Sequence, residues 1–361
     1  MLYHLLYPLR EYFHGFNVFR YITFRAAYAL ITALVLSFVL GPWIIRRLRQ
    51  WRVKDEGRED APDSHQTKGG TPTMGGLLIL LCIAVPTLLW ADLTNHYIWI
   101  ALGATLWLGT VGFVDDFLKR RRRRSLGLVA GEKFGGQILL GVLVGAVLLL
   151  WPMDPAFETR TNLLFLKNYL LELGLLYVPF VVLVIVGTSN AVNLTDGLDG
   201  LAIGVVLFAA AAYAGMCYVV GNIKLAEYLN VLYLRGSGEL TVFCATMIGA
   251  SLGFLWFNAH PAEVFMGDTG ALALGGALGT VAVLIKQELL LLVVGGVFVI
   301  EALSVIIQVG SFKLRGKRVF KMSPLHHHFE LMGWSESKIV VRFWILAMIF
   351  ALVALSTLKI R

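Results

Sequence analysis

Ten long apolar runs dominate the sequence, each close to the roughly 20 residues that an α-helix needs to cross the hydrocarbon core of a bilayer. Each run is apolar around its whole circumference, which is typical of helices surrounded by lipid or by other helices. The runs cover residues 26–45, 74–91, 97–114, 134–151, 173–192, 200–221, 240–257, 269–285, 289–309 and 339–358. The sequence therefore predicts an all-α integral membrane protein with ten transmembrane helices, forming a single polytopic domain over residues 1–361.

Composition excludes a water-soluble protein. Hydrophobic residues make up 58% of the chain and charged residues only 15%, whereas soluble domains carry about 25% charged residues. The net charge of +8 does not indicate a nucleic-acid partner, because in a membrane protein the placement of charge matters more than its sum. The three cysteines, Cys82, Cys217 and Cys244, lie inside apolar runs without metal or disulfide spacing, so we expect small core side chains.

The loops between the runs differ in basic charge, which predicts an orientation. Residues 46–73, 115–133 and 310–338 contain seven, seven and six Lys and Arg, together 20 of the 31 in the chain. The positive-inside rule places these loops in the cytoplasm and both termini on the periplasmic side. The stretch before residue 26 carries Glu11, His14 and Asn17 and lacks a cleavage-like site, so we expect an amphipathic lead-in rather than a signal peptide.

Five polar motifs lie at the predicted cytoplasmic ends of the runs, and the opposite loops contain nothing comparable. They are GTPTMGG at residues 70–76 (including Thr73), DDFLK at 115–119, NAVNLTDGLDG at 190–200, NAHPAEVFMGD at 258–268 and PLHHH at 324–328. This one-sided distribution predicts a single active site facing the cytoplasm at the membrane boundary.

The acids in these motifs favour a metal site. Asp115, Asp116, Asp196, Asp199 and Asp268 sit near helix ends among apolar neighbours, where unpaired carboxylates are costly. Mg²⁺ takes one or two carboxylates together with substrate phosphates, and Asn190 and Asn193 could add carbonyl oxygens. Mg²⁺ or Mn²⁺ is favoured over Zn²⁺ because neither cysteine ligands nor an H-E-x-x-H motif is present.

Simpler interpretations of the acids stay open. Asp196 or Asp199 could cap the sixth helix. A proton or cation pathway would need acids near the middle of the membrane, and only Glu301 qualifies; we expect it to be a partner inside the bundle.

The other polar side chains fit phosphate binding. Lys68, Lys119 and Lys133 are placed to hold a pyrophosphate or a lipid phosphate. His326, His327 and His328 could donate to phosphate oxygens or transfer a proton, although adjacent histidines can also be surface residues. Residues 120–124 are better explained as an orientation signal and an anionic-lipid contact, and Phe265 could stack on a base or anchor the chain at the interface. From the residues alone we expect a membrane enzyme in which a lipid phosphate meets a soluble phosphorylated donor at a Mg²⁺ site.

The same motifs resemble those of a known family. In order and spacing they are similar to the signatures of the bacterial phospho-N-acetylmuramoyl-pentapeptide transferases, within the polyprenyl-phosphate N-acetylhexosamine-1-phosphate transferases, and the resemblance runs from about residue 15 to the end. It implies ten transmembrane helices in the bacterial inner membrane, Mg²⁺-dependent transfer of phospho-MurNAc-pentapeptide from UDP-MurNAc-pentapeptide to undecaprenyl phosphate, and the products lipid I and UMP. A homodimer is expected from the resemblance alone.

The resemblance also implies roles for individual residues. Asp268 and Asn190 would hold the metal, and Asp115 and Asp116 would act near the lipid phosphate, one of them as a base. The remaining set would bind substrate or assist catalysis: Lys68, Asp199 and Phe265 at the uridine, and Asn193, Asp196, Gln308, His326, His327 and His328 in the rest of the pocket, with His327 the most important histidine. Thr73, Lys119 and Lys133 complete the predicted substrate-binding residues. Ala271 and Ser189 depart from the family pattern, which usually has Ser and Gly there.

Two questions of mechanism and class remain at this stage. The lipid phosphate could attack the β-phosphate of the donor directly, which we favour because it is already anionic near neutral pH, or an aspartate could attack first and form a phospho-enzyme. The alternatives to the predicted activity are a related transferase that uses UDP-GlcNAc and, from another class, a secondary transporter of an anionic or lipid substrate.

Overall fold

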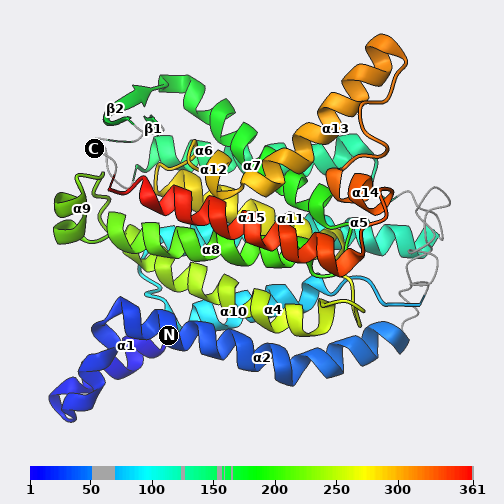
Figure 1. Cartoon of the computed structure of the whole chain (residues 1–361). Coiled ribbons are helices and arrows are strands. Elements are labelled where there is room, and N and C mark those ends of the chain that lie inside the picture. Colours follow the sequence, from blue (N-terminus) through cyan, green and yellow to red (C-terminus); the bar gives the residue numbers. More distant parts are fainter. Residues whose placement is uncertain (51–69, 123–126, 153–156, 158, 164–165, 360–361) are drawn as a thin grey trace.

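The computed structural model describes residues 1–50, 70–122, 127–152, 157, 159–163 and 166–359. It is a bundle of long helices lying side by side, with both chain termini toward one end and the short helix α14 toward the other (Figure 1). The long elements are α2 (Ile22–Gln50), α4 (Gly76–Trp90), α5 (His96–Arg122), α6 (Ala130–Leu150), α7 (Tyr177–Thr195), α8 (Leu201–Val220), α10 (Leu240–Asn258), α11 (Gly267–Leu284), α13 (Gly296–Arg315) and α15 (Glu336–Ser356).

The prediction of an all-α membrane protein is confirmed. Within the described ranges nine helices are long and apolar enough to cross a membrane. The tenth apolar run forms α4, whose 15 residues give a length of about 22 Å at 1.5 Å per residue, less than the roughly 30 Å of a bilayer core.

Helix boundaries differ from the apolar runs in ways that matter for the site. α5 continues through Arg122, so Asp115 and Asp116 lie within the helix rather than after it. The run at 289–309 is broken: the short helix α12 (Leu291–Val294) ends at Gly295, and α13 then extends to Arg315. An apolar run indicates only the part of a helix that is surrounded by lipid. α5 and α13 continue beyond their runs because their polar ends are packed or solvated.

Short elements lie outside the bundle core. The N-terminal stretch forms α1 (Leu2–Leu6) and two 3₁₀ helices, η1 (Tyr7–Glu11) and η2 (His14–Arg20), in which no residue is buried. A two-stranded antiparallel hairpin, β1 (Arg160–Leu163) and β2 (Leu166–Glu172), precedes α7, and the sequence pattern did not predict it.

The centre of the bundle is α11, which packs against α5 and α7 and is the most buried of the spanning helices. Its sequence is rich in Gly and Ala, and small side chains allow the neighbouring backbones to come close. A Cβ on Gly275, for example, would lie 2.7 Å from the Cα of Ser189 on α7. The chain therefore builds its tightest contacts around the helix whose first turn carries Asp268.

Candidate active site

Two glycines bring the end of α5 against the beginning of α11. A Cβ on Gly112 would lie 2.2 Å from the carbonyl oxygen of Asp268, so no larger residue fits there. Gly267 has a φ of +70°, a left-handed conformation that favours glycine, and its Cβ would lie 2.8 Å from Oδ2 of Asp116. These close approaches hold the Asp116 carboxylate directly over the first turn of α11.

Asp116 caps α11 from the neighbouring helix. Its Oδ1 accepts a hydrogen bond from the amide of Asp268 (3.2 Å), and its Oδ2 accepts from the amide (3.0 Å) and hydroxyl (2.7 Å) of Thr269. The first amides of a helix have no partner within it, and here a carboxylate in a different helix supplies the acceptors. Asp116 is thereby tied to the backbone that positions Asp268.

Asp268 lies in an acid–lysine cluster with Asp115, Lys119 and Lys133. Its Oδ2 is 2.7 Å from both the Lys119 and the Lys133 Nζ atoms, and Asp115 Oδ2 is 2.7 Å from Lys119 and 3.6 Å from Lys133. Asp115 is almost fully buried, and its Oδ1 accepts from the amide of Leu128 at 2.7 Å. Three helices, α5, α6 and α11, thus contribute to one charged cluster in an apolar bundle.

The cluster has the donor atoms that a hard divalent cation uses. One carboxylate oxygen from each of Asp115, Asp116 and Asp268 lies within 4.8 Å of the other two, and Mg²⁺ binds such oxygens together with phosphate oxygens. The two lysines provide positive charge at the same place, where phosphate groups would be neutralised. The residues therefore fit a Mg²⁺–phosphate site.

Asn190 lies in the C-terminal, polar part of α7. It pairs with Gln137, to which the sequence analysis assigned no role. Its Nδ2 donates to Oε1 of Gln137 and to the carbonyl of Val186, both at 2.8 Å. Gln137, on α6, is fully buried. Gln137 is a single polar residue inside the fourth apolar run and forms no motif. Its polarity was therefore the only feature of the sequence that could have indicated a polar partner there.

Asp196 follows α7 and is half-buried. Burial, together with the negative charges of Asp268, Asp116 and Asp199, raises its pKa to about 8. These charges place Asp196 within electrostatic reach of the acid–lysine cluster.

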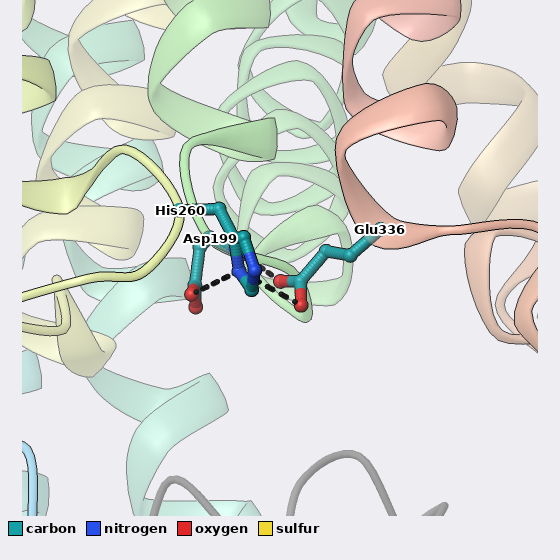
Figure 2. Close-up of side chains that lie close together, drawn as sticks. All are labelled: Asp199, His260 and Glu336. Carbon is teal, nitrogen blue, oxygen red and sulfur yellow. Dashed lines mark hydrogen bonds and ion pairs between the residues drawn. The ribbon is translucent and has the colours of Figure 1, made fainter.

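Asp199 belongs to a second cluster, in which a histidine lies between two carboxylates (Figure 2). The Nδ1 atom of His260 is 3.1 Å from Asp199 Oδ2 and 3.3 Å from Glu336 Oε2. Glu336 Oε1 also accepts from the Asp199 amide at 2.8 Å, and Asp199 Oδ2 accepts from the Ala262 amide at 3.1 Å. The cluster joins the segment after α7, the segment after α10 and the start of α15, and sequence reasoning assigned no role to His260 or Glu336.

The segment after α10 also pairs with the first polar motif. The Phe265 amide donates to the Pro72 carbonyl at 2.8 Å, and its carbonyl accepts from the Gly75 amide at 2.9 Å. Thr73 lies between these two contacts and is half-buried, as is Phe265. Lys68 lies outside the described residues.

The three histidines of α14 (Leu325–Glu330) have different surroundings. His326 is fully buried, with Nδ1 at 3.3 Å from Oε2 of Glu301, which is also fully buried. His327 Nδ1 is 2.7 Å from Glu330 Oε2. His328 Nδ1 accepts from the Lys321 amide at 3.1 Å. Of the three, His326 is fully buried and the other two are half-buried.

Gln308, another predicted pocket residue, makes three hydrogen bonds to the chain that follows α13. Its Oε1 accepts from the Val319 and Phe320 amides and its Nε2 donates to the Phe320 carbonyl, all at 2.9 Å. The amide therefore holds the chain that leads from α13 back to α14, and a contact with substrate would replace one of these bonds. Asn193, half-buried in the last turn of α7, lies between Asn190 and Asp196.

Comparison with known proteins identifies the family. Residues 98–286, which carry the acid–lysine cluster and the segments after α7 and α10, match the family model described as Glycosyl transferase family 4. Proteins named phospho-N-acetylmuramoyl-pentapeptide-transferase are 59% identical in Citrifermentans bemidjiense, 58% in a Geobacter species and 57% in Desulforapulum autotrophicum, with both chains covered over their full length. The chain belongs to the phospho-N-acetylmuramoyl-pentapeptide-transferases of glycosyl transferase family 4.

For a phospho-N-acetylmuramoyl-pentapeptide-transferase, the two departures from the expected motifs lie next to each other in the structure. Ser189 on α7 is buried, accepts from Gln137 Nε2 at 3.3 Å and donates to the Leu272 carbonyl at 3.4 Å. Ala271, the residue before Leu272, is fully buried in α11. The hydroxyl of Ser189 on α7 thus forms hydrogen bonds with both α6 and α11. The bond to α11 is made next to Ala271, which lacks the hydroxyl that the family usually has at this position.

Proposed function

We propose that the protein transfers phospho-MurNAc-pentapeptide from UDP-MurNAc-pentapeptide to undecaprenyl phosphate, forming lipid I and UMP in peptidoglycan biosynthesis. The observation that carries this proposal is the acid–lysine cluster of Asp115, Lys119, Lys133 and Asp268 at the meeting of three membrane helices. Phosphoryl transfer needs charge neutralisation and positioning more than covalent chemistry, and this cluster offers both. The name shared by relatives 52–59% identical over the whole chain supports the same substrates.

The cofactor in this proposal is Mg²⁺, which Mn²⁺ could replace. Asp268 and Asn190 would hold it, with Asp115 and Asp116 close by, and the bound ion would neutralise charge on the pyrophosphate. Lys119 and Lys133 would leave Asp268 Oδ2 to bind phosphate oxygens. Asp115 or Asp116 would take a proton from the lipid phosphate, which would then attack the β-phosphate of the donor in one step.

The nucleotide would lie along the segments after α7 and α10. Lys68, Asp199 and Phe265 would bind the uridine, with Phe265 stacking on uracil. The rest of the donor would contact residues of three motifs and α14: Thr73, Asn193, Asp196, Gln308, His326, His327 and His328. The link from Asp199 to His260 and Glu336 supports a fixed geometry at this end, because it joins three segments that are distant in the sequence.

The topology in this proposal is ten transmembrane helices in one domain, with α4 as the shortest. Both termini would face the periplasm and the active site the cytoplasm, in the inner membrane of a bacterium, and the protein would act as a homodimer. The excess of Lys and Arg in the loops at the site's end of the bundle supports this orientation.

The test is a turnover assay with purified protein, undecaprenyl phosphate, controlled Mg²⁺ and each of two donors, UDP-MurNAc-pentapeptide and UDP-GlcNAc. We expect Mg²⁺-dependent release of UMP with the first donor only. Activity with UDP-GlcNAc alone would assign the protein to the related GlcNAc-1-phosphate transferases. Absence of UMP release with either donor, together with uptake of substrate into vesicles, would assign it to a transporter.

A further inference from the structure

An apolar groove opens between α13, α14 and α15, which contact one another near the end of the bundle where α14 lies (Figure 1). Its volume is about 470 Å³, within the range of roughly 300–1,000 Å³ that is usual for small-molecule sites. Its walls come from Ile300 on α13, Leu325 and Phe329 on α14, and Phe343 and Leu346 on α15. Ile300 and Leu346 are exposed, so the groove is open to the surroundings of the bundle, which for a membrane helix are lipid.

A cationic side chain lines the same groove. Arg342 has its guanidinium carbon 4.2 Å from the centre of the Trp334 ring, and the Lys338 Nζ lies 5.4 Å from that ring. Across the part of the chain that the structure describes, neither Arg342 nor Lys338 makes an ion pair. Arg342 is the seventh residue of α15, about 9 Å along the helix from its first residue.

An arginine at this depth requires an explanation. Charged residues inside membrane-spanning helices are costly and mark a functional contact or a partner by default. The aromatic ring contributes a cation–π contact but leaves the positive charge without an anion. The ligand that would complement this groove therefore has an anionic group at the membrane surface, attached to an apolar chain that continues along α15.

We propose that this groove binds an anionic phospholipid, with an acyl chain between α13 and α15 and its phosphate at Arg342 and Lys338. The bilayer supplies such a molecule at the correct depth, because phosphates lie at the interface where α15 begins and acyl chains lie alongside the rest of the helix. An anionic head group is selected over a zwitterionic one because Arg342 in the groove and Lys338 beside it contribute two positive charges.

A lipid in the groove would contact α14, the helix that carries the three histidines of the predicted active site. Leu325 and Phe329 belong to α14, the helix that carries His326, His327 and His328, and Phe329 stacks on Trp334 with ring centres 4.6 Å apart. A chain in the groove therefore packs against Leu325 and Phe329 of the helix that also carries buried His326. Binding itself does not depend on the transferase reaction, so it is measured separately from activity.

The experiment is native mass spectrometry of delipidated protein given phosphatidylglycerol and phosphatidylcholine with matched acyl chains. We expect the wild-type protein to retain phosphatidylglycerol preferentially. Arg342→Gln is expected to lower this retention about fivefold, as for loss of one basic residue at an anionic surface. Leu346→Trp keeps both charges but fills the groove, and is expected to lower retention of both lipids.

The matched control is Arg47→Gln. Arg47 lies near the end of α2 with its guanidinium 5.8 Å from the Trp43 ring, so it is a second arginine on an aromatic ring, away from the groove. Its loss should leave phosphatidylglycerol retention within error of wild type. Equal retention of the two lipids by the wild type would overturn the proposal. An equal loss of phosphatidylglycerol retention in Arg47→Gln and Arg342→Gln would also overturn it. So would full lipid retention by Leu346→Trp, provided that size-exclusion chromatography shows this variant to be correctly folded.

Discussion

At the scale of single residues, the site depends on side chains whose partners lie on other helices. Asp268 is held by Lys119 from α5 and Lys133 from α6, and its backbone amide is held by Asp116. The motifs predicted which residues gather at one membrane face. They could not predict these pairings, because residues 116 and 268 are brought together by the close packing at Gly112 and Gly267.

Asp268→Asn should reduce Mg²⁺-dependent UMP release by at least about a hundredfold, more than the 10–100-fold typical of losing a residue that only supports a metal ligand. Asparagine keeps the size of the side chain but removes the negative charge that both lysines contact and that would bind Mg²⁺ in the proposed function. Steady-state assays over a range of Mg²⁺ concentrations measure the effect. Asp92→Asn is the control, since Asp92 pairs with His4, outside the cluster; unchanged UMP release by Asp268→Asn would contradict the metal assignment.

Mg²⁺ binding should strengthen as the pH rises from about 7 to 9. Burial and neighbouring acids raise the pKa of Asp196 to about 8, so this carboxyl is largely protonated at pH 7 and becomes charged through that interval. A cation nearby favours the charged form, so binding releases a proton and is stronger at higher pH. Calorimetric Mg²⁺ titrations at several pH values measure the trend, and Asp196→Asn should flatten it. A trend of equal steepness in Asp196→Asn would remove Asp196 as its cause.

At the scale of elements, the helices could be predicted from the sequence because a single property, the length of an apolar run, determines whether a helix forms. Each of the ten apolar runs overlaps a helix, because a run of that length can bury its backbone polar groups in lipid only as a helix. The β1–β2 hairpin was missed, since its residues show neither clear alternation nor a turn signal. The pairing of Asp199 with Glu336 was missed for another reason: 137 residues separate the two, and no local pattern indicates that α15 begins beside α8.

The hairpin is attached to the bundle through a buried carboxylate. Glu288 accepts from the Thr161 hydroxyl of β1 at 2.6 Å and from the Tyr177 hydroxyl of α7 at 2.8 Å, and Lys286 donates to Tyr177 at 2.7 Å. Burial raises the pKa of Glu288, an effect that the Lys286 charge opposes.

Glu288→Ala should lower the free energy of unfolding by about 1–3 kcal/mol for each of the two buried hydroxyls, Thr161 and Tyr177, that it leaves without an acceptor. Thermal unfolding in detergent measures the loss. Glu172→Ala provides the comparison: Glu172 pairs with Arg160 at 3.4 Å on the exposed side of the hairpin, and exposed pairs contribute about 0–1 kcal/mol. Equal effects of the two substitutions would show that the hairpin, and not its buried anchor, determines stability.

At the scale of the whole molecule, the two ends of the bundle have different chemistry. The hairpin and both termini lie toward one end, and α14 with the far end of α13 toward the other (Figure 1). The charge distribution of the loops predicts that the α14 end faces the cytoplasm, because orientation depends on where Lys and Arg lie and not on their total number.

Cysteine labelling tests the orientation directly. The three native cysteines are fully buried, so a single introduced cysteine can be labelled without removing them. A membrane-impermeant maleimide should label Tyr228→Cys from the periplasmic side of spheroplasts and Lys321→Cys only in inverted vesicles. Wild-type protein is the control for background labelling. The reverse pattern would place the active site outside the cytoplasm.

The position of α11 has one more consequence, which concerns the helix dipole. An α-helix carries about half a positive charge at its N-terminus, and the first turn of α11 points at the acid–lysine cluster from within the most buried span of the bundle. Surrounding apolar helices screen this field far less than water would. The backbone of α11 therefore favours negative charge at Asp268 and at any phosphate beside it, and this contribution is kept in every side-chain variant that leaves the helix intact.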